Sequence, residues 1–317
     1  MQNPDHPSDK KPRLPTNRRA PETRLPGFRL TSRDRAIIRA VYRYRVLTTP
    51  QVEALLFRPD QGQPHRTKTS RCRHRLKLLY HHGYLARQEL PTRPSEGRKP
   101  LIYFLDAGAI PLLAQELDVF PEDIDWKPVY NRLQPQSVDH LLAINDVRIA
   151  VDVGAQVTPV RLVRWLDEKT LKSREMRDSV EIVVHQGRRS RATIVPDGYF
   201  LLTDNTYDYH HMLEVDMGTE TLRSSRYNRR DFARKIRGYL AYWQSGKYTA
   251  RYQTEAMRVL TVTTSEKRLA NLVRVTEGVG GGQQFWFTTF AKVTPADVLT
   301  QPIWVVAGED REHALIW

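Results

Sequence analysis

Three acidic residues lie where short apolar segments would be expected to bury methyl groups. Asp197 follows Pro196 in TIVPDGYF, and Glu214 and Asp216 lie within HHMLEVDM. Side chains at i and i+2 of a strand share a face, so Glu214 and Asp216 are expected to point the same way. If Asp197 lies at the matching height on the neighbouring strand, three carboxylates converge. Because burying like charges together is costly, the simplest compensation is a divalent cation, Mg²⁺ or Mn²⁺, bound by Asp197, Glu214 and Asp216. Such a metal would activate a water for attack on a phosphate.

Helices and strands alternate through the C-terminal two-thirds of the chain, and these elements must position the acids. The pattern predicts helices over residues 137–155, 226–244 and 265–277, strands over 159–171, 210–217, 258–264, 283–290 and 303–308, and a hairpin-like pair over 181–202. This order predicts an α/β domain, in which a mixed sheet carries helices on both sides.

This arrangement resembles the PD-(D/E)XK nuclease superfamily, whose core order is αβββαβ. Pro196-Asp197 matches the first half of the motif, and Glu214 matches the acid of the second half. Asp216 stands where the superfamily usually has its lysine. Lys235, in the following helix, is a candidate replacement, since lysines that have migrated to this helix occur in the superfamily. The resemblance therefore implies a restriction-endonuclease-like domain with catalytic candidates Asp197, Glu214, Asp216 and Lys235.

Two further residues near these acids keep alternative interpretations. Glu168, at the end of RLVRWLDEK, either adds a fourth carboxylate from the neighbouring strand or forms a salt bridge at the end of that strand. His140 is either a core histidine or an acid, base or phosphate contact.

The basic charge of the chain belongs to its N-terminal third. The formal net charge is +14, and the first 100 residues hold 23 Lys and Arg against 8 Asp and Glu, whereas the remainder holds 27 against 28. Clustered Lys and Arg are typical of modules that bind nucleic acid phosphates. The proline-rich residues 1–28 contain almost no aliphatic side chains, so we expect a disordered basic tail there.

Residues 29–127 are typical of a winged helix-turn-helix domain. Thr31-Ser32 and the segment TTP at residues 48–50 are start signals for two helices. In a third helix, Cys72, Leu76, Leu79 and Tyr80 recur at helical spacing and form one apolar stripe. Segments 84–90 and 101–106 read as two strands, joined by the loop PTRPSEGRKP as a wing. Cys72 is interpreted as a small core residue rather than a metal ligand.

The face of the third helix opposite this stripe is basic and hydroxylic, as a helix that reads the major groove requires. Ser70, His74, Lys77 and His81 lie on this face or beside it. The candidate DNA contacts of the helix and the wing are Arg66, Lys68, Ser70, Arg71, His74, Arg75, Lys77, Arg93, Arg98 and Lys99. The alternative is a helical interaction module whose basic face is only solvated.

Composition limits the remaining possibilities. One cysteine excludes an internal disulfide and a multi-cysteine zinc site, and neither a secretory signal nor an apolar segment of membrane-spanning length is found. A soluble cytoplasmic protein with no membrane partner is therefore expected. The loop EGVGGGQQ lacks a P-loop lysine and precedes a strand, so nucleotide binding is not predicted.

From Leu30 to Tyr242 the chain resembles the replication-relaxation family of plasmids and related mobile elements. The resemblance lies in LTSRDRAIIRAVYRYRVLTTPQVEALLF, RLKLLYHHGYLAR, DHLLAINDVRIA, WLDE, PDGYF and LEVDMGTE followed by KIRGY. It implies a DNA-binding winged helix in residues 29–127 and a nuclease-like domain in residues 128–317. The expected function is replication or relaxation of element DNA, with duplex DNA and other replication or mobilisation proteins as partners, either as a metal-dependent nickase or endonuclease or as a non-catalytic replication or transcription factor.

Overall fold

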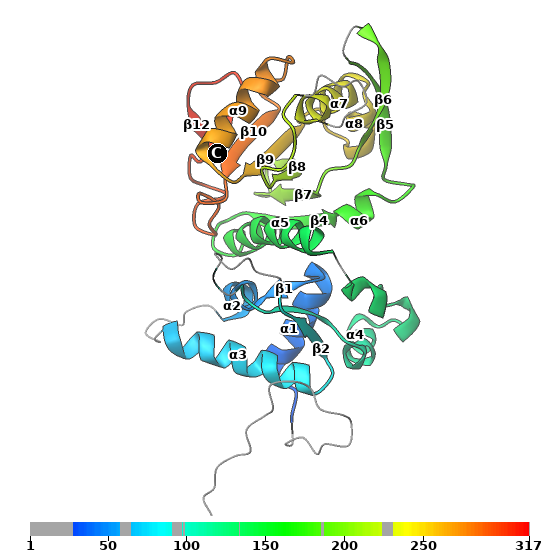
Figure 1. The fold of residues 1–317 in the computed structure, drawn as a ribbon, viewed down its shortest axis with the longest axis vertical. Coiled ribbons are helices and arrows are strands. Elements are labelled where there is room, and N and C mark those ends of the chain that lie inside the picture. The colour runs from blue at the N-terminus through cyan, green and yellow to red at the C-terminus, as the bar shows by residue number, and fades with distance from the viewer. Residues whose placement is uncertain are drawn as a thin grey trace, which may run out of the picture. The chain divides into compact units, whose positions relative to one another are not determined.

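The structure, a computed structural model, describes residues 28–57, 65–90, 97, 99–132, 134–184, 187–223 and 231–316, without the side chains of residues 65–68 and 135. The chain divides into two compact units, Met1–Leu142 and Ala143–Trp317, called here the N-terminal and C-terminal units (Figure 1). Helices and strands mix in the order that the sequence predicts, so the α/β class is confirmed.

The N-terminal unit combines helices with a small antiparallel sheet. Its elements are α1 Ser32–Tyr44, β1 Leu47–Thr48, α2 Thr49–Leu56, α3 His65–His81, β2 Leu85–Gln88, β3 Ile102–Leu105, the 3-10 turn η1 Ala107–Ala109, α4 Ile110–Leu117, η2 Pro121–Asp123 and η3 Pro128–Asn131. The strands lie in the order β1-β3-β2. The three predicted helices and both predicted strands are confirmed, and β1 adds a short third strand.

Side-chain caps begin the first two helices, as the sequence predicts. Thr31 accepts a hydrogen bond from the Asp34 amide while Asp34 accepts one from the Thr31 amide, a capping box. Thr48 and Gln51 repeat this arrangement at the start of α2. Each box pairs amides that a helix start otherwise leaves without partners, which sets where α1 and α2 begin.

Helix α3 buries the apolar stripe that its spacing predicts. Cys72, Leu76 and Leu79 are fully buried. The Cys72 thiol faces the Thr49 carbonyl oxygen at 3.9 Å, and burial raises its pKa to about 12, so this cysteine behaves as a core residue. His81 was expected on the basic face but is buried, with its ring against Tyr80. It lies in the last turn, where α3 passes into the loop leading to β2.

Arg75 has a structural role that the sequence did not indicate. Its Nε lies 2.7 Å from Asp34 Oδ1, and its Nη2 donates to Asp34 Oδ2. Asp34 is fully buried at the start of α1. Burial raises the pKa of this carboxyl, but hydrogen bonds from Arg75 and Thr31 outweigh burial and hold the pKa below its ordinary value. Arg75 was expected to contact DNA, but its guanidinium is instead bound to a buried carboxylate that needs a cation.

The boundary between the units lies later than Lys127, where the sequence places it. Helix α5, Pro135–Gly154, begins in the N-terminal unit. Val138 and Leu142 of α5 pack in one cluster with Val46, Ile102 and Phe104, and Gln51 donates to the Leu142 carbonyl at 2.9 Å. The first turns of α5 complete the core of the N-terminal unit, so the proline-rich segment before α5 is not the boundary.

The C-terminal unit is built on a seven-stranded mixed sheet. Its elements after α5 are β4 Arg161–Asp167, α6 Glu168–Leu171, β5 Asp178–Val183, β6 Arg189–Ile194, β7 Gly198–Thr203, β8 Asp208–Asp216, α7 Phe232–Gln244, α8 Lys247–Tyr252, β9 Arg258–Thr263, α9 Glu266–Glu277, β10 Phe285–Thr289, β11 Trp304–Val306 and β12 Glu312–His313. The strand order is β12-β11-β10-β9-β8-β7-β4. Strands β8, β9 and β10 run parallel, and the other neighbours are antiparallel.

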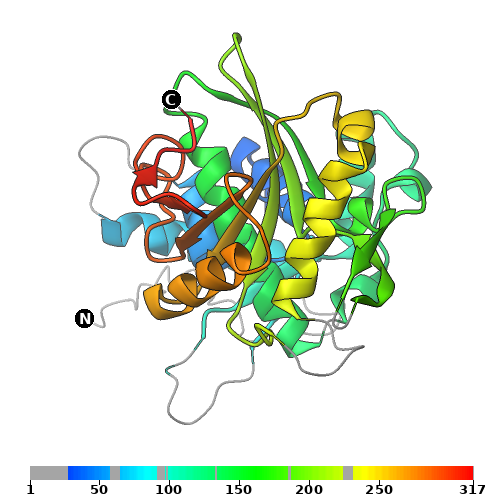
Figure 2. The same ribbon diagram turned by 90° about the horizontal axis from the view of Figure 1, so that it is seen from above.

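Helices cover both faces of this sheet, which confirms the predicted layering. On one face the α5 residues Val147 and Val151 pack against β7 and β8 residues such as Phe200 and Leu213. On the other face α7 and α9 pack against the sheet, as the yellow and orange helices of Figure 2 show. Glu214 and Asp216 belong to this second face, because they alternate with Leu213 and Val215 along β8.

Two details of the C-terminal unit differ from the prediction. The segment over residues 181–202 forms three strands, of which β5 and β6 pair only with each other in a two-stranded sheet. Helix α7 begins at Phe232, where Asp231 caps the Arg234 amide, and residues 224–230 lie outside the described part. No helix within the described ranges is long and apolar enough to span a bilayer.

The Asp34–Arg75 pair should stabilise the N-terminal unit. Replacing Arg75 with Ala leaves a buried carboxylate uncompensated, so the free energy of unfolding in urea should fall by about 3 kcal/mol. Arg73→Ala, two residues away on the exposed side of α3, removes the same charge and should change stability little. Adding Asp34→Asn to Arg75→Ala should recover part of the loss, and a double variant no more stable than Arg75→Ala alone would contradict this role.

Candidate functional site

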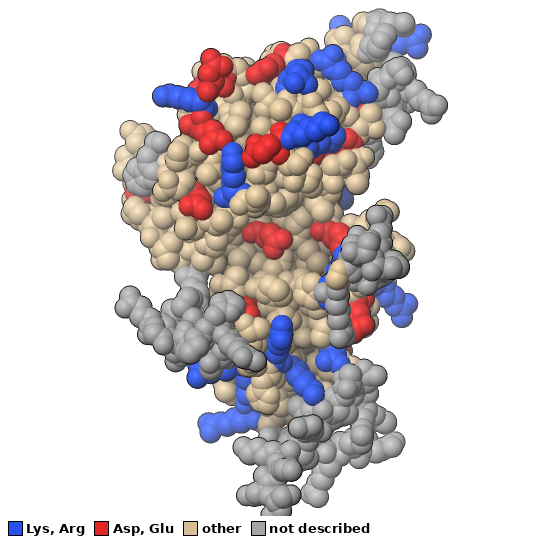
Figure 3. All heavy atoms as spheres, turned by 60° about the vertical axis from the view of Figure 1, so that its left-hand side comes forward, with Lys and Arg blue, Asp and Glu red and all other residues tan. Residues whose placement is uncertain are grey.

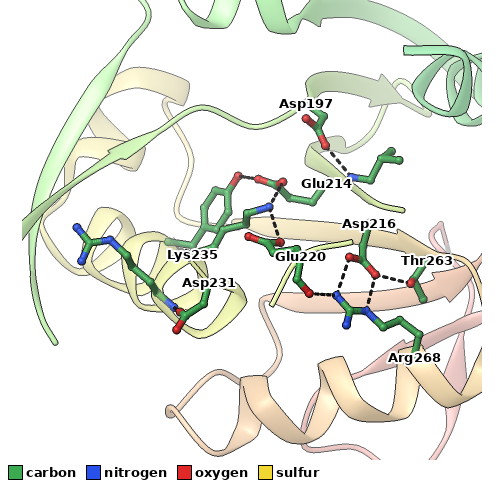
Figure 4. Close-up of polar contacts among 11 residues, drawn as sticks. Asp197, Glu214, Asp216, Glu220, Asp231, Lys235, Thr263 and Arg268 are labelled. Carbon is green, nitrogen blue, oxygen red and sulfur yellow. Dashed lines mark hydrogen bonds and ion pairs between the residues drawn. The ribbon is translucent and has the colours of Figure 1, made fainter. Parts of the chain in front are cut away.

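Asp197 lies beside Glu214, just before the start of β7. The β7–β8 pairing matches Gly198 with Leu213, and the Asp197 amide donates to the same Leu213 carbonyl at 2.9 Å. Asp197 Oδ2 also accepts a hydrogen bond from the Val215 amide at 2.8 Å (Figure 4). These two hydrogen bonds hold Asp197 against β8 on either side of Glu214, although Asp197 is not itself a strand residue.

Helix α7 supplies the partners of Glu214. Lys235 Nζ lies 2.9 Å from Glu214 Oε2, and the Tyr239 hydroxyl donates a short hydrogen bond to Glu214 Oε1. Lys235 and Tyr239 are one helical turn apart, so both face the sheet from the same side of α7. Lys235 also lies 3.3 Å from Glu220 Oε2. Lys235 therefore lies between two carboxylates, as Figure 4 shows.

Burial dominates the electrostatics of Glu214. It raises the pKa of the Glu214 carboxyl to about 7, although Lys235 lowers it, and the charge of Asp197 raises it further. For Lys235, burial lowers the pKa of the ammonium group, but the charges of Glu214 and Glu220 outweigh burial and raise the pKa above its ordinary value. Lys235 therefore remains charged near neutral pH.

Asp216 shares a face with Glu214 but belongs to a different ion pair. Arg268, in the first turn of α9, donates from Nε at 2.8 Å and from Nη2 at 2.9 Å, and the Thr263 hydroxyl donates at 2.7 Å. Burial raises the pKa of the Asp216 carboxyl, but these hydrogen bonds prevail and the pKa lies below its ordinary value. The side chain expected to join a metal cluster is thus neutralised by a protein cation.

The expected cluster of three carboxylates is not formed. Within the described ranges, no three His, Cys, Asp or Glu side chains form a group able to hold a metal ion. The physical reason is that α7 and α9 each bring a separate cation, Lys235 to Glu214 and Arg268 to Asp216. Asp197 and Glu214 do supply the carboxylate oxygens that a hard cation such as Mg²⁺ prefers, and Mg²⁺ often binds proteins through only one or two carboxylates.

Glu168 belongs to a different contact from the Glu214 and Asp216 ion pairs. It is the first residue of α6, and its Oε1 lies 2.5 Å from Nζ of Lys172. Both side chains are about half exposed. The structure favours the salt-bridge interpretation of Glu168, and no contact found among the described residues links it to Glu214.

The sequence did not reveal Glu220 and Arg268 as members of this network. Arg268 Nη2 donates to the Glu220 carbonyl at 2.6 Å as well as to Asp216. It thereby ties the turn after β8 to the start of α9. Gly218, with φ 76°, provides the left-handed conformation of this turn. The pair of Gly218 and a following acid in LEVDMGTE is the only sequence signal that could have pointed to Glu220.

The predicted DNA contacts fall into three groups. Ser70, Arg71 and His74 are exposed on α3, and Lys77 is partly buried there. Arg75 is held by Asp34, and Lys99 Nζ lies 3.5 Å from Asp139 Oδ2. The side chains of Arg66 and Lys68, and the residues Arg93 and Arg98, lie outside the described part of the structure. Figure 3 shows basic side chains on the N-terminal unit and both signs of charge on the C-terminal unit.

Comparison with known families assigns the chain. The sequence model of the replication-relaxation family matches residues 38–257, more than half of the chain, so this protein belongs to the replication-relaxation family. The family associates the chain with replication or relaxation of plasmids and other mobile elements. No curated protein and no solved structure matches the chain.

The raised pKa of Glu214 predicts a specific pH dependence of stability. The ordinary pKa is 4.5 and the folded value is about 7, so between these values the folded protein holds a proton that the unfolded chain has released. This contribution is fully present below pH 4.5 and is lost as the pH rises through 7. The side chain of the Glu214→Gln variant is neutral at every pH, so the variant lacks this pH-dependent contribution to stability. The free energy of unfolding of the variant relative to the parent should therefore rise between pH 5 and pH 8, by on the order of 3 kcal/mol.

Urea unfolding at both pH values measures this difference, and comparing parent with variant cancels the other titrating groups. Glu168→Gln, an exposed acid, is the matched control and should follow the parent. If Glu214→Gln also follows the parent, the Glu214 carboxyl does not titrate in this range.

Proposed function

We propose that this protein binds duplex DNA through its N-terminal unit in the replication or relaxation of mobile-element DNA. The observation that carries the proposal is the division of α3 into two faces. Cys72, Leu76 and Leu79 anchor the helix in the core, while Ser70, Arg71, Arg73 and His74 face solvent. Exposed Arg and Ser side chains on a helix anchored in this way match what a major groove offers, namely phosphates, guanine edges and mixed donors and acceptors.

The arrangement around α3 supports the same proposal. Helices α1 and α2 precede α3, and the antiparallel pair β2–β3 follows it, which is the order of a winged helix-turn-helix. The predicted wing, residues 91–100, falls mostly outside the described part of the structure. A solvated basic face would need no such order, so we favour DNA as the partner of α3.

A second function, cleavage or nicking of DNA by the C-terminal unit, is favoured by the Asp197, Glu214 and Lys235 constellation. The elements α5, β4, β7, β8, α7 and β9 follow the order αβββαβ, with β9 parallel to β8. Lys235 Nζ approaches the acid at 2.9 Å from the helix rather than from the strand. A lysine in this position substitutes for the strand lysine that Asp216 replaces.

The roles of the residues follow from their charges. Asp197 and Glu214 would hold Mg²⁺ or Mn²⁺, which when bound supplies an activated water and charge neutralisation at a phosphate. Lys235, beside Glu214, would orient and neutralise a substrate phosphate. Tyr239 holds the second oxygen of Glu214 and fixes the orientation of the carboxylate. Asp216, bound to Arg268, would take no part in the reaction.

DNA binding is tested by removing two charges from α3. Arg71→Ala combined with Arg73→Ala should weaken binding to duplex DNA and reduce the slope of log affinity against log salt by roughly 2, since each lost phosphate contact accounts for about 0.9. The control, Arg39→Ala with Arg43→Ala, removes the same charge from exposed positions of α1 and should keep the parent slope. If both double variants behave alike, binding depends on net charge and not on α3.

The acid site is tested with Mn²⁺ and supercoiled plasmid. Mn²⁺ should raise the melting temperature of the parent, because only the folded chain brings Asp197 and Glu214 together. Asp197→Ala should abolish this shift, whereas Asp216→Asn should keep it and lower stability in the absence of metal. If the site is catalytic, the parent should nick the plasmid, and Asp197→Ala, Glu214→Ala and Lys235→Ala should not. A metal-dependent shift without nicking would favour the non-catalytic DNA-binding factor.

A further inference from the structure

The β5–β6 hairpin is a second charged surface, distinct from α3 and from the acid site. Its strands pair antiparallel from Asp178 opposite Ile194 to Val183 opposite Arg189. They form a sheet of their own beside α7 and α8, separate from the seven-stranded sheet (Figure 1). A lone two-stranded hairpin is marginally stable in water, so this hairpin, called here the ribbon, needs support from the rest of the unit.

One face of the ribbon obtains this support from α7. Val180, Ile182 and Ile194 are buried in the core cluster that α7 shares. A Cβ atom on Gly238 would lie only 3.1 Å from Ile194 Cδ1, so the glycine lets the ribbon approach the helix closely. Arg234 Nη2 donates to the Ser190 hydroxyl at 2.8 Å and to the Arg191 carbonyl at 2.9 Å. The ribbon is therefore held against the helix that carries Lys235.

Salt bridges and hydrogen bonds also anchor the base of the ribbon. Asp178 accepts hydrogen bonds from Arg251 Nε at 2.5 Å and Nη2 at 2.9 Å, and from the Tyr242 hydroxyl at 2.6 Å. Lys247 Nζ donates to the Ser179 carbonyl at 2.7 Å. The acid at the base is thus neutralised within the unit, and the charge of the ribbon lies on its outer face.

The outer face is basic and hydroxylic. By strand alternation it carries Ser179, Glu181, Val183, Arg189, Arg191 and Thr193, of which Val183 is the one apolar side chain, and the Ser179 and Thr193 hydroxyls lie 3.2 Å apart. Arg188, next to the turn, is also exposed. Glu181 lies 3.5 Å from Arg189, but the side chains are 74% and 79% exposed, so water and salt screen this pair. Exposed arginines and hydroxyls are thus the polar groups that this face presents to a ligand.

We infer that the outer face of the ribbon is a second contact for duplex DNA, made by the C-terminal unit. A two-stranded ribbon fits the major groove, where Arg binds guanine edges or phosphates and Ser or Thr binds either kind of partner. Outside the first 100 residues the chain holds 27 basic against 28 acidic residues, so this basic face is not a by-product of overall charge. The inference rests on the proposed DNA-binding function and adds a surface to it.

The position of the ribbon gives this contact a purpose. Arg234 binds the ribbon, and the next residue, Lys235, binds Glu214. Duplex DNA held on the outer face would thus be bound to a ribbon whose inner face is fixed to the helix that supplies the lysine of the acid site. The ribbon would then position DNA for the C-terminal unit independently of the sequence that α3 recognises.

The full-length chain tests this contact. Arg189→Ala with Arg191→Ala should weaken binding to duplex DNA and lower the salt slope by roughly 2, with an unchanged melting temperature because both side chains are exposed. The control, Lys267→Ala with Arg311→Ala, removes two exposed charges elsewhere in the same unit and should keep the parent slope. Single-stranded DNA of the same length should show no ribbon-dependent change.

Site-specific cross-linking gives a second measurement. Cys72 is buried, so a photoactivatable reagent can be directed to a cysteine introduced by Thr193→Cys on the outer face. Cross-linking to duplex DNA should exceed that from the exposed control Asp310→Cys. Equal cross-linking from the two positions, or a parent-like affinity and slope in the arginine variant, would overturn the ribbon contact and leave the α3 proposal standing. A parent chain that binds no duplex DNA would overturn both.

Discussion

The C-terminal unit is organised around the burial of one carboxylate, Glu214. A buried acid near the end of a sheet strand, covered by a helix, is unstable unless a cation and hydrogen-bond donors face it. Helix α7 supplies both, because Lys235 and Tyr239 lie one turn apart on the side that packs on the sheet. The position of α7 therefore has to pair Glu214 with a cation as well as bury apolar side chains. Because the ribbon packs against α7, its position is fixed with that of the helix.

Charge compensation in this unit is divided between two helices. Lys235 of α7 neutralises Glu214, and Arg268 of α9 neutralises Asp216. Two acids that share a strand face can thus be buried without sharing a cation. This division separates the roles of the two acids. Glu214 lies beside Asp197, whereas Asp216 holds α9 and the turn after β8 in place. Glu220 lies between the two pairs, with its carboxylate at Lys235 and its carbonyl at Arg268.

The N-terminal unit solves a similar problem with a different outcome. Asp34 is buried at the start of α1 and takes Arg75 as its cation, so one of the arginines of α3 belongs to the core. The exposed arginines Arg71 and Arg73 are not needed for folding in this way. Helix α3 therefore carries arginines of two kinds close together. Arg75 binds a buried carboxylate, whereas Arg71 and Arg73 lie on the surface.

The sequence by itself determined most of the order of the elements, the apolar stripe of α3, the capping residues that begin α1 and α2, and the grouping of Asp197 with Glu214. These features depend on local periodicity and on the alternation of neighbouring strands, which are read directly along the chain. Lys235 was predicted as a replacement for the missing strand lysine from the superfamily resemblance, and the structure shows that it also pairs with Glu214.

Only the tertiary structure decided which charged groups meet. Arg268 lies 52 residues after Asp216 in the chain, and Arg75 lies 41 residues after Asp34, so no local pattern connects them. The structure also showed that β5 and β6 form a separate ribbon, since whether two paired strands join a larger sheet depends on what packs against them. The identity of a buried acid can be read from the sequence, but its compensating cation is set by the packing of distant helices.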